Sequence, residues 1–270
     1  MIKYIELIAV AAIIIAGSID KEKMIFNNLL LLTQFITRIP IKLSLACTQE
    51  NFKRASLFFP VVGVFIGAIE YGVFYLTSRL FPIPMAAVIT VMAGVFITGG
   101  LHMDGLGDTC DGFFSFRSRE RIIEIMKDSR VGSFGVLAVF FDLIIKILGV
   151  YYIGIKGIAP MIIVIPMVSR LFTVLVCLIG KNAKEKGTGN LYIGNTSVVY
   201  FTGACILTML IGHMLFPFRA ILVMLATGLV VTLLFNVMCK EKIGGHSGDT
   251  LGANNELVEI CLFIVVSGIL

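Results

Sequence analysis

The sequence has little charge: only 14% of its 270 residues are Asp, Glu, Lys or Arg, and its mean hydropathy is +0.99. Because soluble domains carry about 25% charged residues, this composition excludes a soluble globular protein. The six cysteines stand singly without a Cys-x-x-Cys pair, which argues against a disulfide framework or a zinc site. The net charge of +5 does not indicate nucleic acid as a partner, since membrane proteins concentrate Lys and Arg on one side.

Apolar segments long enough to cross a ~30 Å hydrocarbon core recur along the chain. We predict an all-α, polytopic integral membrane bundle of about seven transmembrane helices (six to eight), forming a single membrane domain over residues 1–270. The expected spans are about 56–76, 85–101, 131–153, 159–179, 198–216, 220–238 and 257–270, with none between 20 and 55. The last segment is short for a complete crossing.

The first 23 residues are an extension with three interpretations: a signal-peptide core, an additional span, or an early start with Met24 as the true one. Residues 24–41 are apolar on average but contain Asn27, Asn28 and Arg38, which favours an interfacial or re-entrant helix over a crossing.

Basic residues separate into two sets of connections. Fourteen fall in the long connections: Arg38, Lys42, Lys53, Arg54, Arg117, Arg119, Arg121, Lys127, Arg130, Lys181, Lys184, Lys186, Lys240 and Lys242. The short connections hold only Arg79, Lys156 and Arg219. By the positive-inside rule the long connections face the cytoplasm, which predicts a multi-pass protein of the cytoplasmic (inner) membrane. The polar motifs described next all fall on that face.

The stretch "LHMDGLGDTCDGF" (101–113) places Asp104, Asp108 and Asp111 on one face if it is helical, because their spacing is i, i+4, i+7. A carboxylate at mid-bilayer costs ~2.5–3.5 kcal/mol, so the segment belongs at the membrane rim. Mg²⁺ and Mn²⁺ prefer clustered oxygen ligands, so we favour a metal site over the alternative of a solvated acidic loop. His102 is either an outer ligand, a base or a structural residue.

Two further segments on this face are typical of phosphate binding. "KDSR" (127–130), followed by Gly132 and Gly135, combines acid, base and flexible backbone beyond a surface helix predicted at 119–129 with Ser118 as its cap. In "KIGGHSGDTLGANNELVE" (242–259), glycines can expose backbone N–H groups to phosphate oxygens. We interpret His246 as a hydrogen-bonding loop residue.

Charges inside the predicted spans are functional suspects. Asp142 and Lys146 stand at i, i+4 and can neutralise each other, which makes a structural pair the simpler interpretation. Arg170 lies mid-span and requires an anion, either a carboxylate of the bundle or a substrate phosphate.

Three motifs resemble the signatures of the cobalamin synthase (adenosylcobinamide-GDP ribazoletransferase) family: "GGLHMDGLGDTCDGFF", "EIMKDSRVGSFGVLA" and "KIGGHSGDTLGANNELVE". Upstream, "TRIPI" and "FFPVVGVFIGA" are similar to the family's N-terminal region, so the resemblance covers roughly residues 33–260. Gly107 and Cys110 depart from the family's usual Ala, but both are small.

The resemblance implies a membrane transferase of cobalamin biosynthesis. Such an enzyme joins adenosylcobinamide-GDP to α-ribazole or its 5′-phosphate, releases GMP and depends on Mg²⁺. Its partners would be these substrates and the lipid bilayer, with no nucleic acid and a possible homo-oligomer. The catalytic candidates are Asp104, Asp108, Asp111 and Asp128, of which the first three would hold the metal. The substrate-binding candidates are His102, Arg117, Lys127, Arg130, Arg170, Gly244, Gly245, Ser247, Asp249, Thr250, Asn254 and Glu256.

Two alternatives belong to other classes. A CDP-alcohol phosphatidyltransferase-like protein also uses an Asp-rich motif at the membrane rim, but "DGLGDTCDG" lacks the Arg of that motif. An ion-coupled transporter would use Asp142, Lys146 and Arg170, and predicts acids distributed along a path through the bundle.

Overall fold

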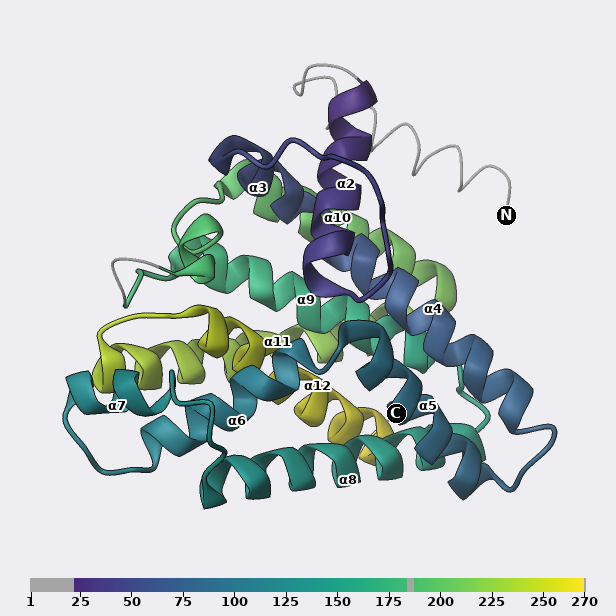
Figure 1. Ribbon diagram of the computed structural model, residues 1–270. Coiled ribbons are helices and arrows are strands. Elements are labelled where there is room, and N and C mark those ends of the chain that lie inside the picture. The colour runs from purple at the N-terminus through teal and green to yellow at the C-terminus, as the bar shows by residue number, and fades with distance from the viewer. Residues whose placement is uncertain (1–21, 184–186, 270) are drawn as a thin grey trace.

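The computed structural model describes residues 22–183 and 187–269, and within them the regular structure is helical apart from one bridge between Asn182 and His246. Residues 1–21 lie outside the described residues, and with them the three interpretations of the N-terminal extension. The elements, shown in Figure 1, are α2 (Glu22–Ile36), α3 (Gln49–Ala55), η1 (Ser56–Phe58), α4 (Phe59–Thr77), α5 (Ile83–Thr98), α6 (Leu101–Phe113), α7 (Arg119–Ile125), α8 (Ser133–Ile155), α9 (Met161–Ile179), η2 (Thr188–Leu191), α10 (Val198–Leu215), α11 (Phe218–Ile243) and α12 (Gly248–Gly268).

The predicted all-α membrane bundle is confirmed. Six helical segments of the described chain are long and apolar enough to cross a membrane, and the number rises to seven if the bent pair α5–α6 forms one span. Helix α2 has only 15 residues, fewer than the ~20 that a crossing requires, in agreement with the interfacial interpretation.

A sharp bend separates the predicted span at 85–101 from the acidic stretch. Helices α5 and α6 meet at 88°. Gly99 and Gly100 both have left-handed φ values, 64° and 68°, which glycine adopts without a side-chain clash. The bend turns the acidic helix away from the direction of α5.

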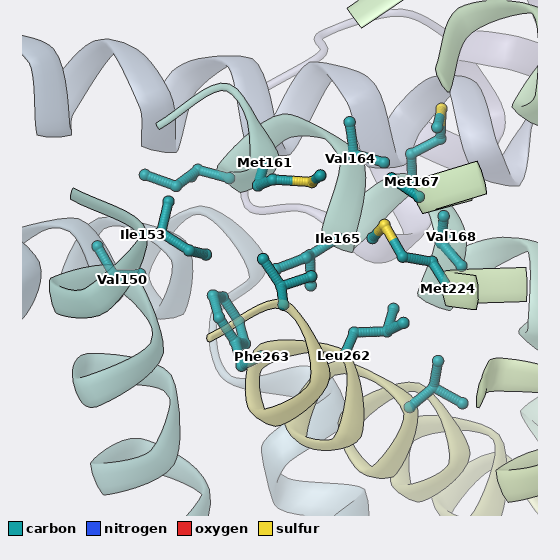
Figure 2. Packing of buried hydrophobic residues seen from close by; sticks show 14 of the residues in the cluster. Val150, Ile153, Met161, Val164, Ile165, Met167, Val168, Met224, Leu262 and Phe263 are labelled. Carbon is teal, nitrogen blue, oxygen red and sulfur yellow. The ribbon is translucent and has the colours of Figure 1, made fainter. Parts of the chain in front are cut away.

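Helix α9 forms the centre of the bundle, and Figure 1 shows it surrounded by its neighbours. Helix α4 packs against it so closely that a β-carbon at Gly67 would lie 2.7 Å from the carbonyl oxygen of Ile162. Figure 2 shows the adjoining core, where Leu262 and Phe263 of α12 face side chains of α8, α9 and α11. Between membrane helices, packing of this kind stabilises mainly through van der Waals contacts, because lipid is as apolar as the side chains themselves.

Two predicted boundaries are wrong. The final helix begins at Gly248 and not at 257, because the polar side chains of its first half find partners inside the bundle. Helix α7 ends at Ile125 and not near 129, and Ser118 occupies its N-cap position without a side-chain capping bond.

The long connections meet at one end of the bundle. Asn195 donates to the carbonyl oxygen of Gln49 at 2.9 Å, and the amide of Ala183 donates to that of His246 at 2.8 Å. Arg119, at the start of α7, approaches the carbonyl oxygen of Ala183 at 3.4 Å. The segments that carry the predicted motifs therefore form one surface, as the pattern of basic residues indicated.

Candidate active site

Helix α6 presents its acidic residues on the side opposite to its buried apolar residues Leu106 and Phe113. Leu106 and Phe113 are 2% and 1% exposed, whereas Asp104 is exposed and Asp108 and Asp111 are half-buried. The acidic stretch is helical, which is the condition under which its spacing places the three acids on one face, and Gly105 and Gly112 lie where neighbouring elements approach.

Close packing of α6 against α12 brings Asp104 and Asp249 to the same cavity. A β-carbon at Gly105 would lie 2.6 Å from the carbonyl oxygen of Asp249, so a larger residue would separate the two helices. The cavity, of about 110 Å³, is lined by both aspartates and by Gly105 and Gly248. An acid from each of two distant motifs therefore faces one space.

The start of α12 is capped by its own side chains. Ser247 and Thr250 form a reciprocal capping box, with the amide of Ser247 donating to Thr250 Oγ1 at 2.8 Å. The amides of Gly244 and Gly245 donate to the carbonyl oxygens of Lys240 and Cys239 at 3.0 and 3.3 Å. The amides of Gly244 and Gly245 are thus used within the chain, whereas Gly248 lines the cavity, and phosphate binding by this loop stays a prediction.

Asn254 and Glu256 lie inside the bundle and not in a loop at its rim. They are 0% and 5% exposed, because α12 has already begun at Gly248. Glu256 is ion-paired with Lys146, whose Nζ also lies 3.3 Å from Asp142 and 3.0 Å from Glu259. The predicted Asp142–Lys146 pair is confirmed, as part of a larger network.

Arg170 belongs to the same network. It is 2% exposed, and its Nη1 lies 3.2 Å from Glu259 Oε1 and donates to the carbonyl oxygen of Pro166 at 3.0 Å. Of the two anions considered for Arg170, the structure supplies the carboxylate of the bundle, and a substrate phosphate is not needed.

His102 lies between the cavity of Asp104 and Asp249 and the buried ion-pair network of Lys146 and Arg170. It is 7% exposed, lines the cavity of Asp104 and Asp249, and places its Nδ1 3.9 Å from Glu256 Oε1. That distance is beyond hydrogen-bonding range.

Asp111 holds the start of α8. Its Oδ2 accepts the amide of Gly132 at 2.7 Å, and its Oδ1 accepts the amide of Gly135 at 2.8 Å. An anion at a helix N-terminus satisfies free N–H groups and the helix dipole. Asp111 thus has a structural use that its sequence spacing did not indicate.

The KDSR segment lies beside Asp111, around an open pocket of about 310 Å³. Arg130 donates hydrogen bonds to Asp128 from its side chain, at 2.6 Å, and from its backbone amide. Together these bonds lower the pKa of the Asp128 carboxyl to about 2. A carboxylate with such a low pKa is a weak base, which argues against proton transfer to Asp128. Arg117 and Lys127 are exposed on the same surface.

His246 is structural, as predicted. Its ring is fully buried, with Nε2 3.1 Å from Asn236 Oδ1 and Nδ1 3.2 Å from Thr250 Oγ1. Burial lowers the pKa of His246 to about 4, so the ring is neutral at physiological pH.

Across the described ranges, no three His, Cys, Asp or Glu side chains are arranged to hold a metal ion. The predicted set of Asp104, Asp108 and Asp111 is therefore not assembled in the structure, and metal binding stays a prediction. Mg²⁺ itself commonly takes only one or two protein carboxylates and completes its shell with water and substrate phosphates.

Sequence reasoning missed four side chains that the structure singles out. Glu70 and Glu259 are acids inside apolar spans, and that unusual position is the signal that could have identified them. They line a polar interior cavity of about 50 Å³ with Lys146 and Arg170. Acids therefore lie in the interior of the bundle as well as on the face that carries the motifs. Tyr192 and Thr173 line the cavity of Asp104, and no sequence pattern indicated that they would meet.

Comparison with known proteins identifies the family. The cobalamin-5-phosphate synthase family matches residues 28–267. Adenosylcobinamide-GDP ribazoletransferases of Clostridium tetani and Clostridium botulinum (strain Langeland) are 45% and 42% identical to the chain, over 90% of its length and 97% and 98% of theirs. The Clostridium kluyveri protein of the same name is 40% identical over 90% of the chain and 97% of its own. No solved structure shows significant similarity. The chain belongs to the cobalamin-5-phosphate synthase family of transferases.

Proposed function

We propose that this protein joins adenosylcobinamide-GDP to α-ribazole, or to its 5′-phosphate, at the cavity between α6 and α12. The observation that carries the proposal is that Asp104 and Asp249, from two separate family-like motifs, line one cavity. This cavity lies at the end of the bundle where the long connections meet, which we call the motif-bearing end. The curated relatives are named for the same transfer. The family match also favours this reaction over a phosphatidyltransferase or an ion-coupled transporter.

The reaction is a phosphoryl-type transfer. A ribose hydroxyl of α-ribazole attacks the phosphorus attached to cobinamide, and the bond from that phosphorus to the bridging oxygen of GMP breaks. The new phosphodiester completes the corrinoid, GMP leaves with the bridging oxygen, and the hydroxyl proton passes to a base. Such transfers depend on positioning and on neutralisation of oxygen charge more than on covalent catalysis.

Asp104 and Asp249 would hold Mg²⁺. Both supply hard oxygen donors to one cavity, and both are accessible enough to share the ion with water and a diphosphate. When bound, the ion neutralises charge on the phosphate oxygens. We assign Asp111 to the N-terminus of α8 and leave it out of the metal set.

The remaining polar residues of this surface have other roles. Asp108, one helical turn from Asp104, is our candidate for the proton acceptor in place of Asp128. Arg117 and Lys127 are exposed cations on the same end, where they can attract the phosphates of the incoming substrate.

The motif-bearing end would face the cytoplasm, as the basic residues predict. Cys47 is exposed in the connection between α2 and α3 and reports on this orientation. A membrane-impermeant maleimide should label Cys47 only after cells are permeabilised, and Cys47→Ser provides the control. Labelling of Cys47 in intact cells, with an introduced cysteine at Lys156 protected, would reverse the assignment.

Turnover tests the proposal directly. Purified protein in lipid nanodiscs, given adenosylcobinamide-GDP, α-ribazole and Mg²⁺, should form complete corrinoid and an equal amount of GMP, both measured by mass spectrometry. A parallel reaction with α-ribazole 5′-phosphate shows which acceptor is preferred. Absence of product with both acceptors, from protein that unfolds cooperatively, would refute the proposed function.

A further inference from the structure

The cavity of Asp104 and Asp249 has a second wall that the proposed chemistry does not use. This wall is formed by Phe35 of α2, Phe59 of α4, Thr173 of α9 and Tyr192, which follows η2. Asp104 is exposed and Asp249 half-exposed, whereas Thr173 and Tyr192 are 3% and 2% exposed. The cavity therefore has an acidic opening and a largely aromatic floor, in which Phe59, Thr173 and Tyr192 are buried and Phe35 is exposed.

Aromatic contacts fix the floor in place. The ring of Tyr192 lies 5.3 Å from that of Phe35, 5.1 Å from that of Phe52 and 5.4 Å from that of Phe59, measured between centroids. Rings at these separations contribute ~0.5–1.5 kcal/mol per pair beyond their burial, which holds the tyrosine in one position. A rigid aromatic surface is suited to a flat ligand.

Two hydroxyl groups of the floor lack partners. Tyr192 Oη and Thr173 Oγ1 are buried, and neither makes a hydrogen bond to any described part of the chain. Leaving a buried hydroxyl unsatisfied costs ~1–3 kcal/mol, and such groups usually have a partner. Because both residues line a cavity of about 110 Å³, a molecule bound there lies next to these two hydroxyl groups and can supply the partners that they lack.

We propose that this floor binds the guanine base of the nucleotide, and that the phosphates of that nucleotide extend toward Asp104 and Asp249. The inference rests on the proposed function for the presence of a guanosine nucleotide. Guanine is flat and carries donors and acceptors along its edge, which match two hydroxyl groups beside aromatic rings. The benzimidazole of α-ribazole offers a single free ring nitrogen and would leave a hydroxyl unpaired. A site that uses such hydrogen bonds rejects analogues that lack them.

Binding of free nucleotides tests the assignment without turnover. Purified protein in nanodiscs with Mg²⁺ should bind GMP more tightly than AMP. Tyr192→Phe and Thr173→Val each keep the shape of the residue and remove its hydroxyl, so each should weaken GMP binding about 5- to 10-fold, as loss of one neutral hydrogen bond does. Tyr152→Phe is the matched control, since Tyr152 is 48% exposed on α8 and does not line the cavity.

Steady-state kinetics then identify which substrate uses the floor. Tyr192→Phe should raise the KM for adenosylcobinamide-GDP and leave the KM for α-ribazole unchanged. Unchanged GMP binding in both floor variants, or a rise in the KM for α-ribazole instead, would overturn the proposal. Failure of the wild-type protein to make corrinoid would refute the proposed function, whereas the binding experiment reports on the floor in either case.

Discussion

Acidic residues occupy two regions of this protein in two different ways. In the interior, Asp142, Glu256 and Glu259 surround Lys146, and Arg170 also pairs with Glu259. At the motif-bearing end, Asp104 and Asp249 line an open cavity, where Asp104 is exposed and Asp249 is half-buried.

The difference follows from solvation. A carboxylate enclosed among membrane helices is costly unless a cation lies beside it, so the interior acids come with their own partners. Acids at the end of the bundle stay hydrated and can exchange water for a metal ion and a phosphate. We therefore expect the interior network to determine stability and the acidic cavity to determine turnover.

Asp104→Asn should lower turnover the most while leaving stability nearly unchanged. The variant keeps the size of the side chain but removes its charge, so turnover should fall by about 1,000-fold or more, comparable to losing a key electrostatic contact in a phosphoryl or acyl transfer. Thermal unfolding in detergent should remain within a few degrees of wild type. The control is Glu124→Gln, an exposed acid of α7 that should change neither quantity.

The opposite outcome is expected from Lys146→Met. Removing the cation leaves buried carboxylates without compensation and should cost about 3–5 kcal/mol of stability. The double variant Lys146→Met/Glu256→Gln should recover part of the loss, whereas Leu148→Met on the exposed side of α8 should be neutral. If Lys146→Met unfolds like wild type, the interior network is not a main source of stability.

His246 offers a pH-dependent test of the packing beneath the acidic cavity. Its pKa is lowered from 6.5 to about 4, so the folded state resists protonation. The unfolded chain then binds more protons between these values, and stability should be complete above pH 6.5 and fall as the pH decreases toward 4. The loss attributable to His246 should reach about 3 kcal/mol, at 1.36 kcal/mol per pKa unit. His246→Gln should show a flatter decline than wild type when unfolding is compared at pH 7 and pH 5.

Asp111 should give a smaller effect on stability. Asp111→Asn weakens the acceptor at the start of α8 and should cost about 0.5–2 kcal/mol, the usual range for a helix cap. Its unfolding temperature can be compared with that of Asp128→Asn, which lies nearby but accepts no bond from α8. Equal unfolding temperatures for Asp111→Asn and wild type would remove the capping role.

Much of the fold could be predicted because apolar length and basic residues identify spans and their ends. Most predicted spans differ from the helices by only a few residues. The start of α12 could not be predicted, because its polar residues are typical of a loop. They are compatible with a buried helix only because Glu256 pairs with Lys146 on another helix. Periodicity describes one helix at a time and carries no information on such partners.

The candidate site could be predicted only in part, because tertiary contacts decide which of its side chains meet. The helical spacing of Asp104, Asp108 and Asp111 correctly gave one face of α6, but the bend at Gly99 and Gly100 and the packing at Gly105 decide which acids share a cavity. Tyr192 and Thr173 join that cavity through tertiary contacts between distant segments. No local motif contains that information.

The most direct test of the account compares Asp249→Asn with Asp111→Asn in the same corrinoid-forming assay. Asp249 lies across the cavity from α6, whereas Asp111 is on α6 but bonded to α8. We predict that Asp249→Asn loses turnover as severely as Asp104→Asn, and that Asp111→Asn retains at least a tenth of wild-type activity. Full activity in Asp249→Asn, with complete loss in folded Asp111→Asn, would contradict the account.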